Sequence, residues 1–303
     1  MGELRTGYLL GIGAYLSWGF FPLYFTLLRP AGPLEILAHR IVWSALFVAL
    51  LLTVTRGWRR LAGLARRPRT LLGIGVAAVL IAVNWGTYIY GVNTARVVET
   101  SLGYFITPLI SVAFGLVFFG ERLRPAQWVA LGLGTAAVAV LAVDYGRPPW
   151  IALTLAGSFA SYGLLKKRLG LPPTDGLFVE SAALALPALG YLTWLALAGR
   201  STFTDSPGHL TLLVAAGAIT AVPLLMFAGA ANRVPLVGLG ILQYIAPILQ
   251  FLIGVLVEHE PMPAPRLLGF ALVWLALIGF TGDGIRQGRR IPAEVVPAGQ
   301  AVR

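Results

Sequence analysis

The sequence predicts an all-α membrane protein whose ten transmembrane helices form two inverted five-helix repeats. About ten apolar stretches are each roughly 20 residues long, a length that spans the roughly 30 Å hydrocarbon core of a bilayer as a helix. Apolar residues make up 57% of the chain and charged residues only 12%, whereas a soluble domain carries about 25% charge. Basic residues gather in alternate joints, and the two halves share residues at a nearly constant spacing.

The predicted helices follow one another with short polar joints between them. Their ranges, each set by an apolar run, are 7–28, 34–55, 71–92, 99–119, 125–143, 149–166, 176–198, 209–230, 236–257 and 265–282. The first run is too long for a cleaved signal peptide and lacks a small-residue cleavage site, so we expect it to remain as a membrane helix.

Charge placement predicts the orientation of these helices. Seventeen of the 23 basic residues fall in alternate joints that begin with the N-terminal segment, five fall in the other joints, and Arg40 lies within a helix. By the positive-inside rule, both termini are expected in the cytoplasm of a multi-pass protein of the plasma or inner membrane. The net charge of +11 therefore reflects topology, and the expected partner is the lipid bilayer, not nucleic acid.

The two halves of the chain look like copies of each other. Residues of the first half recur 139 to 145 positions later, including Glu35 at Glu180, Asn93 at Asn232, Pro108 at Pro247 and Gly115 at Gly254. Five helices are an odd number, so the second copy must cross the bilayer in the opposite sense, as in many secondary transporters. We expect repeats over 1–146 and 147–284 and a polar cytoplasmic tail over 285–303. The alternative is chance agreement among helices rich in Leu, Ala and Gly.

Polar groups inside the predicted helices are the candidate functional residues, because a charge at mid-helix costs about 2.5–3.5 kcal/mol unless it has a partner or faces a water-filled cavity. We expect a substrate cavity or gate to be formed by Glu35, His39, Arg40 and Trp43 in the second helix, Asn84, Trp85 and Tyr88 in the third, Glu99 and Tyr104 in the fourth, and Gln243, Tyr244 and Gln250 in the ninth.

Two of these residues have alternative interpretations. Arg40, the deepest charge, either grips substrate or latches helices by pairing with Glu99 or Glu35, or else forms a structural salt bridge. Asn84 lies near the midplane, where its amide either lines a cavity or bonds a neighbouring helix.

Prolines within three helices mark candidate hinges. Pro108 and Pro247 occupy corresponding positions in the two halves, and Pro223 lies in the eighth helix. A proline removes one backbone hydrogen bond and bends a helix, so paired breaks near the midplane predict a hinge or a binding region.

Three further carboxylates have less specific roles. Glu180 either carries a coupling proton, if burial raises its pKa, or pairs with Lys166 or Lys167. Glu121 and Glu260 lie at loop junctions, where helix capping or surface ion pairing is expected.

The sequence lacks the signatures of enzymes and of cofactor or metal proteins. There is no cysteine, and the three histidines lie far apart, so we expect no metal and no cofactor. There is no phosphate-binding loop, no segment long enough for a nucleotide domain and no hydrolase motif, so we expect no enzyme activity. An intramembrane enzyme acting on a lipid, or a channel, is the alternative to a transporter.

Several short motifs together resemble a known family. They are Ser17-Trp18-Gly19 with Pro22 and Tyr24, Glu35 to Arg40 followed by Trp43-Ser44, Asn84-Trp85, Ser101 to Ile106 with Pro108, Val222 to Leu225, and Gln243-Tyr244-Ile245 with Pro247. Over essentially its whole length the chain resembles the drug/metabolite transporter superfamily, in its EamA-type branch and the RarD group of predicted permeases. Thr107 and Ala246 depart from the residues common in that group.

The resemblance implies a ten-helix inner-membrane permease with two EamA repeats. Such a protein is expected to move a small organic metabolite or drug by alternating access, without ATP hydrolysis, driven by an ion gradient such as that of protons. The group's label of chloramphenicol sensitivity does not establish a transported substrate.

Overall fold

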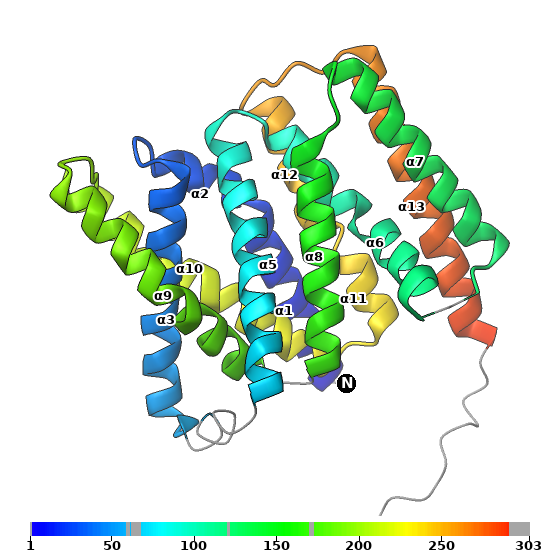
Figure 1. The fold of residues 1–303 in the computed structure, drawn as a ribbon. Coiled ribbons are helices and arrows are strands. Elements are labelled where there is room, and N and C mark those ends of the chain that lie inside the picture. Colours follow the sequence, from blue (N-terminus) through cyan, green and yellow to red (C-terminus); the bar gives the residue numbers. More distant parts are fainter. Residues whose placement is uncertain (1, 59–60, 62–67, 120–121, 170–172, 291–303) are drawn as a thin grey trace, which may run out of the picture.

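A computed structural model describes residues 2–58, 61, 68–119, 122–169 and 173–290, and this part of the chain is helical with no strand (Figure 1). The helices are α1 (Gly2–Gly19), α2 (Phe21–Leu27), α3 (Pro33–Val54), α5 (Pro68–Asn93), α6 (Val97–Phe119), α7 (Pro125–Tyr145), α8 (Trp150–Leu169), α9 (Pro173–Leu197), α10 (Pro207–Ala231), α11 (Leu236–Leu242), α12 (Ile245–Leu256) and α13 (Ala264–Arg290). The all-α prediction is confirmed, since every predicted segment falls on a helix.

Most of these helices are suited to cross a membrane. Within the described residues, eight spans are long and apolar enough, and there are nine if the bent pair α1 and α2 is counted as one span. Helix α8 does not qualify, because Lys166 and Lys167 in its last turns lower its hydropathy. The prediction of ten membrane spans therefore remains a prediction.

The first predicted helix, 7–28, is divided into α1 and α2 by a bend. It bends by 42° between α1 and α2, near Phe20. Pro22 lacks the amide that would bond the carbonyl of Trp18, so the helix loses a bond there. That carbonyl instead accepts a hydrogen bond from Nε2 of Gln250 on α12 at 3.0 Å.

The two symmetry-related prolines behave differently. The ninth predicted helix is interrupted at Gln243 and Tyr244, between α11 and α12, and Gln243 is the residue whose carbonyl the ring of Pro247 crowds. In contrast, α6 and α10 continue through Pro108 and Pro223. The predicted pair of matching breaks is therefore seen in one half only.

The last helix runs further than predicted. Helix α13 continues to Arg290, so residues 285–290, predicted to belong to the polar tail, extend a membrane helix. The remainder of that tail, 291–303, lies outside the described residues.

The helices pack as a bundle in which partners are often distant in sequence. Helix α7 packs on α13, α3 on both α9 and α10, α8 on both α5 and α6, and α1 on α10. The N-terminus and the last turn of α13 lie at the same end of the bundle (Figure 1). We call the other end, which carries connections 28–32, 94–96, 146–149, 198–206 and 257–263, the outer end, following the predicted topology.

Glycines bring the packed helices close together. A side chain at Gly217 of α10 would overlap the backbone carbonyl of Trp43 on α3, and one at Gly103 of α6 would lie 2.8 Å from Cβ of Leu155 on α8. Lipid tails are as apolar as leucine, so membrane helices associate through such close contact of small residues and through polar bonds, not through burial from water.

We expect Gly217→Ala to lower the thermal-unfolding temperature of the detergent-purified protein, because overpacking costs about 1–3 kcal/mol when a backbone has to move. Gly132→Ala is the matched control, since a side chain there meets no atom within 4 Å. Equal melting temperatures for the two variants would contradict the close packing of α3 on α10.

Candidate functional site

Arg40 lies at the centre of the polar residues inside the bundle. Its side chain projects from the first half of α3, and only 4% of the residue is exposed. Its Nε donates to Oγ1 of Thr220 on α10 at 2.9 Å. The guanidinium lies over the ring of Trp85 on α5, with its carbon 4.0 Å from the ring centroid, and it is also close to the rings of Phe21 and Phe25 on α2. Both halves of the chain thus enclose this cation.

The predicted pairing of Arg40 with Glu35 or Glu99 is wrong, and so is a structural salt bridge to any other described carboxylate. Oε1 of Glu35 accepts from the amide of Thr202 at 2.7 Å and from the hydroxyl of Ser201 at 3.1 Å. Glu99 binds Arg147. Both carboxylates lie in the first turn of their helices, at the outer end, and they bind connections there instead of reaching inward.

Asn84 joins three helices beside this cation. Its Nδ2 donates to the carbonyl of Leu155 at 3.0 Å and to Oγ of Ser158 at 3.2 Å, both on α8. Its Oδ1 accepts from the hydroxyl of Tyr104 on α6 at 3.2 Å. The interpretation of Asn84 as a bond to a neighbouring helix is confirmed, and this bond also positions Tyr104.

Tyrosines complete the surroundings of Arg40. The rings of Tyr24 and Tyr88 contact Phe25, which lies beside the guanidinium, and Tyr88 contacts Tyr104 in turn. Tyr104 donates to Asn84, and Tyr24 donates to the carbonyl of Leu212 at 2.6 Å. The hydroxyl of Tyr88 is buried and has no hydrogen-bond partner among the described residues. We call Arg40, Trp85, Tyr88, Tyr104 and Asn84 the central cluster.

Other predicted cavity residues lie apart from the central cluster. His39 stacks on Phe203 with 4.6 Å between ring centroids and accepts from Trp43 at 3.3 Å, so both residues face the α9–α10 connection. Gln250 binds Trp18. The hydroxyl of Tyr244, which follows Gln243, lies 3.5 Å from that of Thr281 on α13.

Glu180 forms the ion pair that was one of its two predicted roles. Its Oε1 accepts from Lys166 at 2.8 Å and its Oε2 from the hydroxyl of Tyr162 at 3.0 Å, so α9 is tied to α8. Only 2% of Glu180 is exposed. Its role as a proton carrier remains a prediction.

Sequence reasoning missed Thr220, Ser158, Phe21 and Phe25 as parts of the site. A hydroxyl three residues before Pro223 was the available signal for Thr220. Phe21 and Phe25 flank the Pro22 and Tyr24 of the family motif. Which helix faces Arg40 depends on tertiary packing, and no local pattern carries that information.

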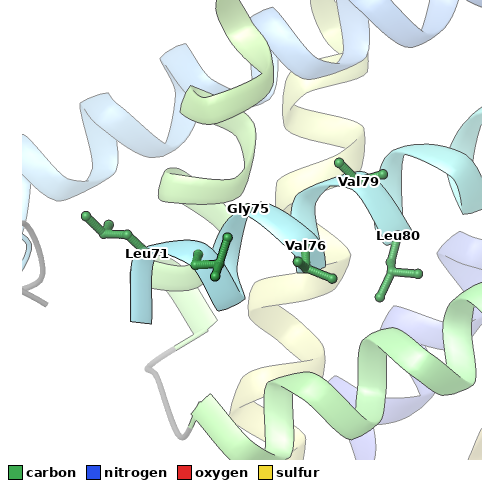
Figure 2. A pocket seen from close by; sticks show the side chains of 6 residues that line it. Leu71, Gly75, Val76, Val79 and Leu80 are labelled. Atoms are coloured by element: carbon green, nitrogen blue, oxygen red, sulfur yellow. The ribbon is translucent and has the colours of Figure 1, made fainter. Parts of the chain in front are cut away.

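Two apolar hollows lie along the described helices, and no residue of the central cluster lines either of them. One encloses about 470 Å³ along α5 and is lined by Leu71, Leu72, Gly75, Val76, Val79 and Leu80 (Figure 2). The other encloses about 240 Å³ between α6 and α7. None of the predicted cavity residues lines either hollow, and Arg40, Asn84 and Tyr88 of the central cluster are buried.

The outer end is held by carboxylates that bind backbone amides or arginines. Gly146 adopts a left-handed conformation (φ 63°) that ends α7. Arg147 follows it and pairs with Glu99 at 2.8 Å. Arg266 at the start of α13 pairs with Asp144 at the end of α7, also at 2.8 Å. These contacts join the segments before residue 146 to those after it.

Glu260 caps a helix in the other half of the chain. Its carboxylate accepts from the backbone amides of Val97 and Val98, which begin α6. The predicted capping role of Glu260 is confirmed; Glu121 lies outside the described residues. Burial raises the pKa of Glu260 to about 7, with the neighbouring Glu258 adding to the rise, while the two amides and Arg266 oppose it.

Comparison with known proteins identifies the family. The sequence profile described as the EamA-like transporter family matches residues 5–143. Protein RarD of Streptomyces exfoliatus is 54% identical over 99% of this chain and 96% of its own length. Protein RarD of Escherichia coli K12 is 41% identical over 95% of this chain and 98% of its own length. The chain belongs to the RarD group of the EamA-like transporter family.

Membership in the RarD group makes the chain a multi-pass integral membrane protein of a bacterial transporter family, a permease. A crystal structure of another protein shares the fold, with a TM-score of 0.60 at 20% sequence identity, and it covers 93% of this chain and 99% of its own. The predicted family resemblance is confirmed.

We expect the stability of this RarD-group protein to depend on pH through Glu260. Its folded pKa, about 7, exceeds the ordinary value of 4.5, so the stabilisation from this proton is full below about pH 4.5 and is lost as the pH rises through about 7. The melting temperature of the wild type should therefore fall, relative to Glu260→Gln, between about pH 5 and about pH 8.

The control for this measurement is Asp205→Asn, which removes an exposed carboxylate from the α9–α10 connection. Its melting temperature should follow the wild type at every pH. A constant difference between wild type and Glu260→Gln across this range would show that Glu260 does not titrate there.

Proposed function

We propose that the protein is a secondary transporter that moves a small organic metabolite or drug across the bacterial inner membrane by alternating access. The observation that carries this proposal is the central cluster: a buried cation with aromatic and amide groups, enclosed by helices of both halves. Ionisable groups inside a membrane bundle are costly and mark substrate or ion pathways. Transporters of inverted-repeat architecture bind substrate near the midplane, between their repeats.

Helix packing supports two five-helix repeats, 1–146 and 147–284. If the repeats correspond in order, α1 with α2 matches α8, α3 matches α9, α5 matches α10, α6 matches α11 with α12, and α7 matches α13. The packing of α5 on α8 then corresponds to that of α10 on α1, and the α6–α8 contact corresponds to α12 on α1. Each of the contacting pairs α3–α9, α6–α12 and α7–α13 consists of two corresponding helices, so exchanging the two repeats leaves these contacts unchanged. The family profile, which matches 5–143, covers nearly the first of these units.

The outer end supports a closed gate on that side. Three contacts join different segments there. Glu260 binds the start of α6, Arg266 pairs with Asp144, and Glu35 binds the α9–α10 connection. Alternating access would require these contacts to separate when the outer end opens. Glu180 is the candidate carrier of the predicted coupling proton. Its carboxylate would release Lys166 when it binds the proton.

Transport is tested by uptake into sealed proteoliposomes, with and without a proton gradient. Accumulation of organic metabolites faster than in empty vesicles is the expected result. Single-channel currents would indicate the channel alternative, and no faster flux for any metabolite would contradict the transporter.

We expect Asn84→Ala to reduce uptake by about tenfold or more while leaving membrane insertion intact. The buried amide holds Tyr104 and α8 together, and leaving its partners unpaired costs about 1–3 kcal/mol. Asn93→Ala is the matched control, because this amide of the same helix binds the carbonyl of Ala31 at the outer end. Normal uptake by Asn84→Ala would place the substrate site elsewhere.

The inverted topology predicts that corresponding connections lie on opposite sides of the membrane. Arg56 and Asp205 each follow the second helix of a repeat, and the chain has no cysteine, so Arg56→Cys and Asp205→Cys give single reactive thiols. We expect an impermeant maleimide to label Asp205→Cys in intact cells and Arg56→Cys only after the membrane is opened. Labelling of both in intact cells, or of neither, would contradict the inversion.

A further inference from the structure

We propose that the substrate is an organic monoanion whose carboxylate binds the guanidinium of Arg40. This inference rests on the proposed transport function and names the chemical class that the central cluster recognises. It follows from the hydrogen-bond donors, charges and ring surfaces around one side chain.

The guanidinium of Arg40 has unused donors. Arginine carries five N–H donors and stays charged in proteins. Only the Nε donor of Arg40 has an acceptor within the described chain, the hydroxyl of Thr220, so the two terminal nitrogens and their four N–H groups bind no protein oxygen. A buried charge is stable only when it is paired and its donors are satisfied. The terminal N–H groups of Arg40 are therefore available to an anion.

No described carboxylate fills that place. Glu35 binds Ser201 and Thr202, Glu99 binds Arg147, and Glu180 binds Lys166 and Tyr162. The ion pairs among the described residues do not include Arg40. Arg40 therefore has no carboxylate partner among the described residues, and we assign its counter-charge to the substrate.

The orientation of Arg40 suits a carboxylate. Thr220 holds Nε, and the ring of Trp85 covers a face of the guanidinium at 4.0 Å. The terminal N–H groups lie in the plane of the guanidinium and form a fork that matches the two oxygens of a carboxylate. The buried hydroxyl of Tyr88, which has no partner, lies near the same cation and offers a further donor.

The charge of the central cluster and its aromatic surface restrict the chemical class of the substrate further. Arg40 is its one cation, so a carboxylate would neutralise the site, whereas a phosphate dianion would leave one negative charge unpaired in a medium where that is costly. The remaining walls are aromatic, with Phe21 and Phe25 facing the guanidinium. Rings pack well against a flat apolar body, so the structure favours an organic acid over an inorganic anion.

The test compares acids with their uncharged counterparts on full-length wild-type protein. Detergent-purified protein is screened by thermal shift, and proteoliposomes by uptake, with phenylacetate, indole-3-acetate and aliphatic monocarboxylates, each beside its primary amide and the corresponding amine. A ligand that binds the folded state raises the melting temperature. We expect hits among the acids, with at least about tenfold weaker binding of each matching amide, because the amide cannot neutralise Arg40.

Variants assign the effect to Arg40. Arg40→Gln should abolish the difference between acid and amide, and Arg40→Lys, which keeps the charge but not the fork, should weaken acid binding by about tenfold. Arg200→Gln is the matched control, since it removes an exposed arginine at the outer end and should bind acids like the wild type. If Arg40→Gln does not fold, Thr220→Val, which frees Nε, should weaken acid binding while amides are unaffected.

The outcomes separate the two proposals. Binding and uptake of amides or amines in preference to acids would overturn the monoanion while leaving the transporter in place. Unchanged acid binding in Arg40→Gln would move the site away from Arg40. Uptake of no acid, amide or amine above empty vesicles would overturn the transport function and, with it, the substrate class.

Discussion

The structure depends on one constraint: a polar group within a bilayer has no water to bind, so it must find its partner in the protein. The chain meets this requirement almost everywhere by joining helices that are distant in sequence. Asn84 binds Leu155 and Ser158 across the central helices, and the Lys166–Glu180 pair ties α8 to α9. Arg40 meets it only in part, because Nε alone has a protein acceptor among the described residues, and the proposed substrate site is built on its remaining donors.

Backbone groups obey the same constraint. Pro22 frees the carbonyl of Trp18, and the side-chain amide of Gln250 on α12 occupies it. The carbonyl of Trp18 is therefore paired at the bend between α1 and α2, and Phe21 and Phe25 beyond the bend lie close to the guanidinium of Arg40. A helix break and the wall of the candidate site are in this way two results of a single proline.

The sequence allowed the helices and many polar residues to be predicted, because apolar runs, basic joints and isolated charges are local signals. The pairing of Glu180 with Lys166 could also be predicted, since both residues lie toward the same membrane surface in successive helices. The partners of Arg40 were not, because they depend on how α3 is rotated against α10 and α5. Matching prolines likewise did not ensure matching breaks: α6 passes Pro108 unbroken, whereas the chain is interrupted before Pro247.

The contact of Gly217 with the main chain at Trp43 has a mechanical consequence. Where one backbone lies directly on another, no layer of side chains separates the helices, so sliding α10 along α3 would drive main-chain atoms against each other. The hydrogen bond from Arg40 to Thr220 joins the same two helices, four residues or fewer from that contact on each. In the proposed alternating-access cycle, this packing favours movement of α3 and α10 together with Arg40, while the surroundings of the cation on α2, α5 and α6 change.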